Sequence, residues 1–493
     1  MSREEIVSEN MTIESIPAAL RNTNGLINGL WVSGKSSFPD YNPANGDLLA
    51  EITAMGAEET VEAVAAADQA FRSWSKLTVA ARVAAIYRWA QEIRNHSESL
   101  ALLMTLEQGK PLAEAEGEWL HGARCLEWYA EEAQRVHGST LPSNQENQRN
   151  LTISQPVGVM AAVTPWNFPA VSILVKCGAA ITAGCTVVLK PSEETPLCAS
   201  AIAELALAAS IPAGVLNVIP ANDPASVGDV LTQDPRVKML SFTGSTAVGR
   251  LLNTQAAPTI KKVAMELGGN APFIVFEDAD LEAAACALVG ARFYNNGQIC
   301  IGANRILVHE SVHETFIKLL VEKVSKITTG DGTQAGHQCG PMINAGSMDK
   351  LERLVADAVE QGGQVVVGGH KKIKDTLFYL PTVITNLSPS MAIWSEEVFG
   401  PVAPIYSFSS EEEALDLANN TDAGLAAYFY SGNMSRCWRV AEALEVGMVG
   451  CNTSNIALLD IPFGGIKQSG NGREGGIGCL AEYLEVKSIS FGI

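Results

Sequence analysis

Two side chains with the chemistry of a nucleophile and a base stand in unusual local settings. Cys300 follows an amide- and glycine-rich stretch, Asn295-Asn296-Gly297-Gln298-Ile299. Backbone N–H groups at such a turn can stabilise a thiolate, which would make Cys300 a nucleophile; the alternative is a buried structural cysteine. Glu266 ends an apolar run, where burial would raise its pKa toward that of a general base. Its alternative is a solvated carboxylate at a strand end.

Three further segments carry polar groups directly after strand-like runs, where ligands bind in α/β proteins. Asn167 lies in Thr164-Pro165-Trp166-Asn167, and its amide could donate to an oxyanion. Lys190 and Glu193 follow the next run and could bond ribose hydroxyls. The turn at 241–250, with Gly244 and Ser245, opens a helix whose N–H groups could face a pyrophosphate. It is neither G-x-G-x-x-G nor a Walker sequence, so a plain tight turn is its alternative.

The elements that must position these residues alternate between strands and helices. Short β-branched runs without polar alternation are typical of parallel strands covered on both faces. They lie at 157–163, 186–189, 215–218, 239–242, 262–266 and 273–276. Helical periodicity marks 57–73, 79–109, 112–136, 196–209 and 310–327. This order predicts an α/β fold with a doubly wound Rossmann-like domain, and a second α/β series from 279 to about 450, including a helix at 279–295.

Composition limits the class of protein. The 493 residues are 47% hydrophobic, enough for sizeable cores in two or more domains. A formal net charge of −20 disfavours nucleic acid and membrane surfaces as partners. The ten cysteines include no C-x-x-C pair and the start of the chain lacks an apolar signal region, which together predict a cytoplasmic protein with reduced thiols. The uncharged stretch 157–175 contains Pro165 and Pro169, so strand, loop and helix are favoured over a membrane span.

In their order and spacing these pieces resemble the aldehyde dehydrogenase superfamily, from about residue 25 to residue 490. The specific segments are Glu266–Asn270 (ELGGN), Gly297–Cys300 (GQIC), Glu396–Pro401 (EEVFGP) and Pro462–Gly470 (PFGGIKQSG). Within the superfamily, LEVGMVG at 444–450 and KQSGNGRE at 467–474 are most similar to the succinate-semialdehyde dehydrogenase branch.

The resemblance implies a mechanism. Cys300 would attack the aldehyde carbon, the Asn167 amide would hold the oxyanion, and Glu266 would activate water against the resulting thioester. Lys176 and Glu474 match a proton-relay pair, with a buried ion pair as the alternative. No metal is required. The cofactor would be NAD in preference to NADP, because Glu193 would repel a 2′-phosphate. Residues matching the cofactor site are Thr164, Trp166, Lys190, Glu193, Gly244, Ser245, Leu267, Glu397 and Phe399.

The resemblance also implies a domain plan and self-association. Residues 1–133 and 155–265 would form the NAD(P)-binding domain, and 266–462 the catalytic domain. Residues 134–154 and 463–493 would supply an oligomerisation arm and a C-terminal strand that pairs with a neighbouring subunit. The alternating VKSISFGI tail suits such an edge strand. A homodimer or homotetramer is expected.

The chain departs from the branch where the substrate would bind. Two arginines that would hold the far carboxylate of a semialdehyde are replaced by Val175 and Tyr294, and a second cysteine near the nucleophile is replaced by Gly302. A funnel with Phe168, Tyr294 and Phe463 suits an apolar or aromatic aldehyde, which is the alternative to a semialdehyde. Two other functional classes remain as alternatives: a non-catalytic relative with a structural or binding role, and a cysteine hydrolase or acyltransferase without a redox step.

Overall fold

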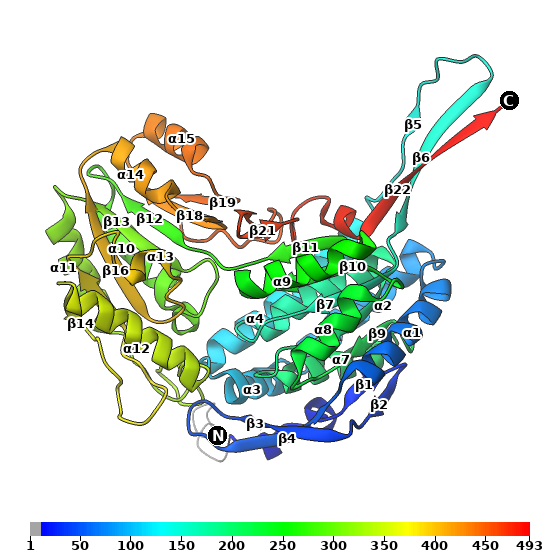
Figure 1. Ribbon diagram of the computed structural model, residues 1–493, viewed down its shortest axis with the longest axis horizontal. Coiled ribbons are helices and arrows are strands. Elements are labelled where there is room, and N and C mark those ends of the chain that lie inside the picture. Colours follow the sequence, from blue (N-terminus) through cyan, green and yellow to red (C-terminus); the bar gives the residue numbers. More distant parts are fainter. Residues whose placement is uncertain (1–10) are drawn as a thin grey trace.

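The computed structural model describes residues 11–493, and Figure 1 shows two α/β bodies with a long β arm. The start of the chain, residues 1–10, which bears on the expected absence of a signal peptide, lies outside this part. Within residues 11–493, no helix combines the length and apolarity needed to cross a membrane. The stretch 157–175 folds as strand, loop and short helix, as the sequence predicts.

Within the described residues, an eight-stranded sheet has the order β2-β1-β9-β8-β7-β10-β11-β21. The five strands from β9 to β11 in this order are parallel, and β1 and β21 pair antiparallel at either side. The chain passes from β7 to β8 and β9, then returns to place β10 on the other side of β7. Ligands bind at such a reversal, outside the carboxyl ends of the strands. The strands are β1 (Gly25–Ile27), β2 (Leu30–Val32), β7 (Val159–Val163), β8 (Thr186–Lys190), β9 (Leu216–Val218), β10 (Val237–Thr243), β11 (Lys262–Glu266) and β21 (Gly470–Asn471).

Helices cover both faces of this sheet, which explains why its strands are apolar throughout. Val159 and Ala161 of β7 pack against one group of helices, while Met160 and Ala162 pack against the other. The first group is α1 (Ala57–Trp74), α8 (Pro224–Gln233) and α9 (Thr246–Ala256). The second is α2 (Val79–Asn95), α3 (Ser97–Gln108), α4 (Leu112–Ala133), α5 (Pro169–Ile173), α6 (Ala179–Ala183) and α7 (Pro196–Ala208).

One expected helix is divided. The pattern at 79–109 predicts a single helix, but the backbone leaves helical geometry at His96 (φ −111°, ψ 12°), and α2 and α3 form instead. The His96 ring contacts the Glu92 carbonyl at 2.9 Å, so side-chain bonding competes with the helix at this point.

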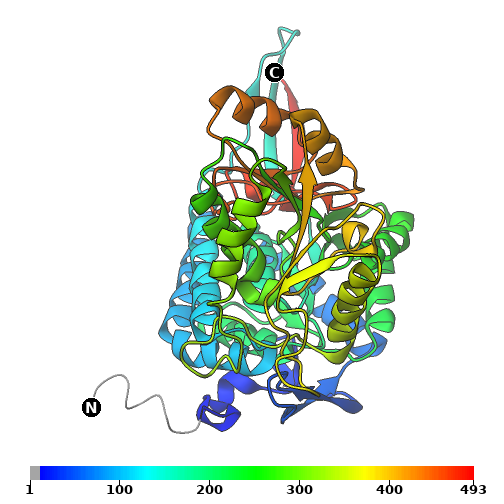
Figure 2. The ribbon, with the colours of Figure 1, turned by 90° about the vertical axis from the view of Figure 1, so that its left-hand side faces the viewer.

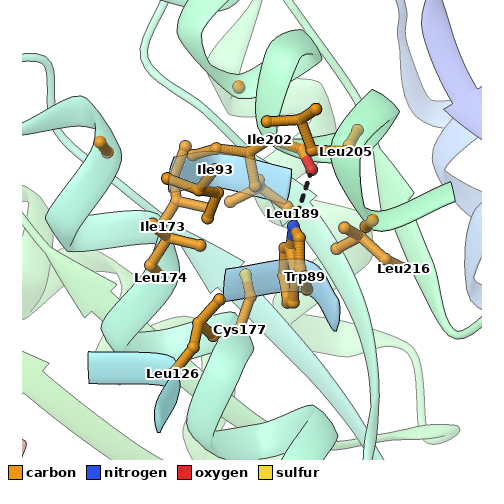
Figure 3. Packing of buried hydrophobic residues seen from close by; sticks show 14 of the residues in the cluster. Trp89, Ile93, Leu126, Ile173, Leu174, Cys177, Leu189, Ile202, Leu205 and Leu216 are labelled. Atoms are coloured by element: carbon orange, nitrogen blue, oxygen red, sulfur yellow. Dashed lines mark hydrogen bonds between the residues drawn. The ribbon is translucent and has the colours of Figure 1, made fainter. Parts of the chain in front are cut away.

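The core under the second group of helices holds the segment that follows α5 (Figure 3). Trp89 of α2 donates its indole N–H to the Ile202 carbonyl of α7 at 3.2 Å. Residues 174–178 form a π-helical turn, in which Leu174 and Cys177 pack into this core. The turn leaves Val175 at the edge of a cavity and Lys176 beside Glu474, so the core fixes the direction of both side chains.

A seven-stranded sheet in the described part of the chain has the order β14-β15-β16-β13-β12-β18-β19, parallel except for β14. Its strands are β12 (Ala271–Val275), β13 (Ala303–His309), β14 (Gln364–Val367), β15 (Thr382–Thr385), β16 (Val402–Phe408), β18 (Ala426–Tyr430) and β19 (Met448–Cys451). The accompanying helices are α10 (Leu281–Phe293), α11 (His313–Val324), α12 (Ala345–Glu360), α13 (Ala392–Ser395), α14 (Glu411–Asn419) and α15 (Met434–Ala443). Two small pairs complete the strands: β3 (Ser36–Tyr41) with β4 (Leu48–Ala54), and β17 (Ala423–Gly424) with β20 (Ile466–Lys467).

The arm projects from the rest of the molecule in both views (Figures 1 and 2). It consists of β5 (Thr140–Leu141), β6 (Gln148–Pro156) and β22 (Leu484–Gly492), in the order β22-β6-β5. The sequence predicts a C-terminal strand that pairs with a neighbouring subunit. One edge of β22 pairs antiparallel with β6 of its own chain, and pairing of its other edge with a neighbouring subunit stays a prediction. The backbone groups on one edge of β22, a nine-residue strand, are paired with β6. Its other edge is the outer edge of the three-stranded sheet.

Candidate active site

A cavity of about 740 Å³ lies where the two sheets face each other, and the candidate chemical residues line it. Asn167 follows β7, Glu266 ends β11, and Cys300 lies between α10 and β13. The structure therefore brings these three side chains, more than 130 positions apart at the extremes, into one space.

The turn before Cys300 has an uncommon backbone. The sequence predicts a helix to Asn295, but α10 ends at Phe293, and Asn295, Asn296 and Gly297 all have positive φ (48°, 55° and 71°). Asparagine and glycine are the residues that best tolerate this conformation. A Cβ on Gly297 would lie 2.3 Å from the Gly400 carbonyl oxygen, so glycine is required where the two segments meet.

The electrostatics of Cys300 differ from the sequence-based expectation. Burial raises the pKa of the thiol well above 9.0, and the neighbouring Glu266 and Glu397 carboxyls raise it further. Backbone N–H groups of the turn act in the expected direction, but they do not outweigh burial. The thiol is therefore protonated in this state and needs a nearby base.

Glu266 has the properties expected of that base. Desolvation, followed by the charge of Glu474, raises its pKa from 4.5 to about 8, as its position at the end of an apolar strand predicts. Its Oε1 is buried without a hydrogen-bond partner in the part of the chain that the structure describes. A carboxyl with a free oxygen and a pKa near neutrality can exchange a proton with a thiol or a water molecule.

A buried polar network holds Asn167, and the sequence patterns did not reveal it. The Asn167 side-chain amide donates to the Gln298 carbonyl at 3.0 Å, and Asn295 donates to the Asn167 carbonyl at 2.8 Å. Lys110 donates to the same carbonyl at 2.9 Å and pairs with Glu118. Charged residues usually face solvent, so neither Lys110, in the loop between α3 and α4, nor Glu118 of α4 is identified by a sequence pattern.

Lys176 and Glu474 form an ion pair, with a Lys176 side chain that is 1% exposed. Glu474 lines the cavity and raises the pKa of Glu266, while Lys176 lowers it. The pair is thus in electrostatic contact with the candidate base. This arrangement is compatible with both alternatives, a proton relay and a structural ion pair.

The candidate cofactor residues divide into two groups. Trp166, Gly244, Ser245, Leu267, Glu397 and Phe399 line the main cavity. Ser245 caps α9 by accepting from the Val248 N–H at 3.4 Å, so the helix begins at the cavity wall. Trp166 and Phe399 meet edge to face with ring centres 5.6 Å apart. Glu397 accepts from the Gly269 N–H at 3.2 Å, and burial raises its pKa to about 7.

The second group lies beside the main cavity. Lys190 donates to Glu193 at 2.8 Å, and the Lys190 carbonyl accepts from the Thr164 N–H at 3.2 Å. Thr164 Oγ1 is buried without a partner in the described residues. Together the two groups offer an anion-compatible helix start, carboxylates for ribose hydroxyls and an aromatic wall, a donor set that fits a nicotinamide dinucleotide. Across residues 11–493, no three His, Cys, Asp or Glu side chains are grouped to hold a metal ion.

The remaining wall is mostly apolar and aromatic. Phe168 and Tyr294 stack with ring centres 6.1 Å apart and an interplanar angle of 19°, and Phe463 and Val175 also line the space. One face of α4 completes this wall with Gly117, Glu118, His121, Cys125, Trp128 and Tyr129. These residues recur at intervals of three or four along α4, and this spacing is the sequence signal that identifies them as one face of the helix.

Comparison with known proteins agrees with this geometry. The model of the aldehyde dehydrogenase family matches residues 31–489. The chain is 48% identical to the mitochondrial succinate-semialdehyde dehydrogenase of Arabidopsis thaliana, covering 98% of this chain and 93% of that one. It is 47% identical to the NADP(+) succinate-semialdehyde dehydrogenase GabD of Escherichia coli (95% and 97% covered) and to 3-sulfolactaldehyde dehydrogenase of Pseudomonas putida (96% and 98%).

Among solved structures, succinate-semialdehyde dehydrogenase from Burkholderia pseudomallei superimposes with a TM-score of 0.96 at 47% identity, covering 97% of this chain and 99% of that one. The doubly wound fold expected from the sequence is confirmed, as is the resemblance drawn from its motifs. A family match over nearly the whole chain, and a shared fold at this identity, show that the protein is an NAD(P)-dependent oxidoreductase acting on aldehydes. The chain belongs to the aldehyde dehydrogenase family.

Proposed function

We propose that this enzyme oxidises a short aldehyde that carries an anionic group at its other end, using NAD in preference to NADP, through a thioester on Cys300. The observation that carries the proposal is the single cavity lined by Cys300, Glu266 and Asn167. These are the groups needed for nucleophilic attack, proton transfer and oxyanion binding.

The first step is attack by Cys300. Because its thiol is protonated in the buried site, the proton must leave as the C–S bond forms, and Glu266 is the neighbouring base. The sulfur adds to the aldehyde carbon, and the carbonyl oxygen becomes an oxyanion. The Asn167 amide uses one N–H for the Gln298 carbonyl and can present the other to this oxygen.

When bound, the oxidised nicotinamide supplies a hydride acceptor, so that the thiohemiacetal becomes a thioester. Trp166, Glu397 and Phe399 are the cavity residues proposed to bind its nicotinamide half. Glu266 releases the thiol proton to solvent and, as a carboxylate again, takes a proton from the water molecule that attacks the thioester carbon. The C–S bond breaks, the acid leaves, and the Cys300 thiol is restored by the proton returned from Glu266.

Relatives support the substrate class. Succinate semialdehyde and 3-sulfolactaldehyde, named for enzymes 47–48% identical to this chain, both carry an anionic group away from the aldehyde. A kinetic panel of succinic semialdehyde, glutaric semialdehyde, butanal and benzaldehyde, each with NAD and NADP, tests the proposal. We expect the highest kcat/KM for a semialdehyde; a higher value for butanal or benzaldehyde would overturn the anionic class.

NAD should be preferred over NADP by about tenfold in kcat/KM, equivalent to roughly 1.4 kcal/mol. Burial alone would raise the pKa of Glu193, but the Lys190 charge and hydrogen bond outweigh it, and the pKa lies below 4.5. Glu193 is therefore an anion. It forms an ion pair with Lys190, the residue that would otherwise bind a 2′-phosphate, and its own charge would repel that phosphate. Glu193→Ser should shift the ratio toward NADP.

The matched control is Glu194→Ser, since Glu194 accepts instead from Asn344 at 2.8 Å, and this change should leave the ratio as it is. Equal use of both cofactors by the wild type, or an unchanged ratio in Glu193→Ser, would contradict the assignment.

The protein should form dimers or tetramers. The outer edge of β22 has unpaired backbone groups, and Val486 and Phe491 on this strand are 72% and 49% exposed. Such an edge is a template for pairing with another copy. Light scattering at micromolar concentration should give a mass of two or four chains, and Val486→Asp should lower it. A monomeric mass for the wild type would refute the expectation.

A further inference from the structure

His121 is one of two basic residues that line the cavity in the described part of the chain; the other is Lys350. Lys350 donates to the Glu397 carbonyl at 2.7 Å, so it belongs to the part of the wall with Glu397 and Phe399. His121 lies on the α4 face with Cys125 and Trp128 and lines the same cavity as Phe168 and Tyr294.

The carboxylates on the same wall are already neutralised. Glu118, three residues before His121, accepts from Lys110 and from the Ala170 and Val171 N–H groups. Glu474 is paired with Lys176. The protein has a formal net charge of −20, but the negative charges of Glu118 and Glu474 are each balanced by a lysine. These two carboxylates would therefore repel the anionic end of a substrate only weakly.

The imidazole itself is suited to donate a hydrogen bond. Burial, followed by the charge of Arg124, lowers the pKa of His121 below 6.5, so the ring is neutral at neutral pH and carries one N–H. Arg124, three residues further along α4, is exposed and does not line the cavity.

We propose that His121 is the specificity-determining residue that binds the anionic end of the substrate, in place of the arginines absent at Val175 and Tyr294. The proposal rests on the proposed function. It assigns to α4 the discrimination between a carboxylate- or sulfonate-bearing aldehyde and an uncharged aldehyde of equal length. The chemistry at Cys300 does not depend on it.

The test compares kcat/KM for succinic semialdehyde with that for butanal in the purified full-length enzyme. His121→Leu should lower the value for the semialdehyde by about tenfold or more, since it removes a hydrogen bond to a charged group, and should change the value for butanal by less than about twofold. The loss should fall mainly on KM. His121→Gln, which keeps an N–H donor, should retain most of the preference.

The matched control is His370→Leu, an exposed histidine outside the cavity, which should match the wild type with both substrates. Equal losses for both aldehydes in His121→Leu would assign the residue to packing and overturn the inference, as would an unchanged preference. If the wild type itself oxidises butanal as efficiently as the semialdehyde, the proposed substrate class fails, independently of what His121 does.

Discussion

Cys300→Ala should abolish aldehyde oxidation, lowering kcat by at least ~1,000-fold, while the protein still binds reduced cofactor. The reaction requires a covalent thioester on sulfur, which alanine cannot form. No other thiol lies at the turn between α10 and β13 to replace it. The measurements are steady-state turnover with succinic semialdehyde and a fluorescence titration with NADH.

Cys286→Ala is the control, because Cys286 is an exposed thiol on α10, the helix before the same turn. It should retain full activity. Turnover above a few per cent of the wild-type kcat in Cys300→Ala would refute the assignment of the nucleophile, and loss of NADH binding would indicate a folding defect instead.

Glu266→Gln should slow hydrolysis of the acyl-enzyme more than formation of it. The glutamine keeps the size of the side chain but cannot take a proton. Acylation should slow, because Cys300 must then lose its proton to water, but hydrolysis should slow more, because the attacking water is a weak nucleophile without a base. Stopped-flow absorbance should show a burst of reduced cofactor of one per active subunit, followed by turnover slowed by about 100-fold or more.

The pH dependence provides an independent check on Glu266. The base acts as a carboxylate, and with a pKa of about 8 that form increases as the pH rises from 7 to 9. Turnover of the wild type should therefore rise across this range, whereas the slow phase of Glu266→Gln should lack the rise. If the burst shrinks in parallel with the steady-state rate, the main role of Glu266 is to remove the Cys300 proton before hydride transfer, and its assignment as the base for hydrolysis is wrong.

The sequence predicted the positions of the central parallel strands well, because strands buried on both faces must be apolar throughout. It also predicted that Asn167 follows such a strand, that Glu266 ends one and that Cys300 precedes one. The backbone of the Asn295–Gly297 turn was not predictable, since the helical pattern of α10 continues to Asn295 while the Gly400 carbonyl imposes a different path. Tertiary contact decided that boundary, not local propensity.

Buried charged residues were the second feature that the sequence did not predict. Lys110, Glu118 and His121 lie on or near helices whose polar residues look like an ordinary solvent face. Only the docking of α4 against α5 and the π-helical turn shows which of them face inward. The partner of the C-terminal strand was likewise hidden, because strand pairing between residues more than 300 positions apart leaves no local pattern.

The long-range pairing of β22 with β6 has a consequence for the order of folding during synthesis. Residues 148–156 emerge more than 300 positions before their partner at 484–492. Two further contacts of the site also come late: the Ser469 carbonyl, which accepts from the Leu267 N–H, and Glu474, which pairs with Lys176. The doubly wound sheet can begin to fold on the ribosome, whereas the arm must wait with an open edge and the active site with an unpaired buried lysine. Nascent chains of this enzyme should therefore be inactive and dependent on chaperones until β22 has left the ribosome.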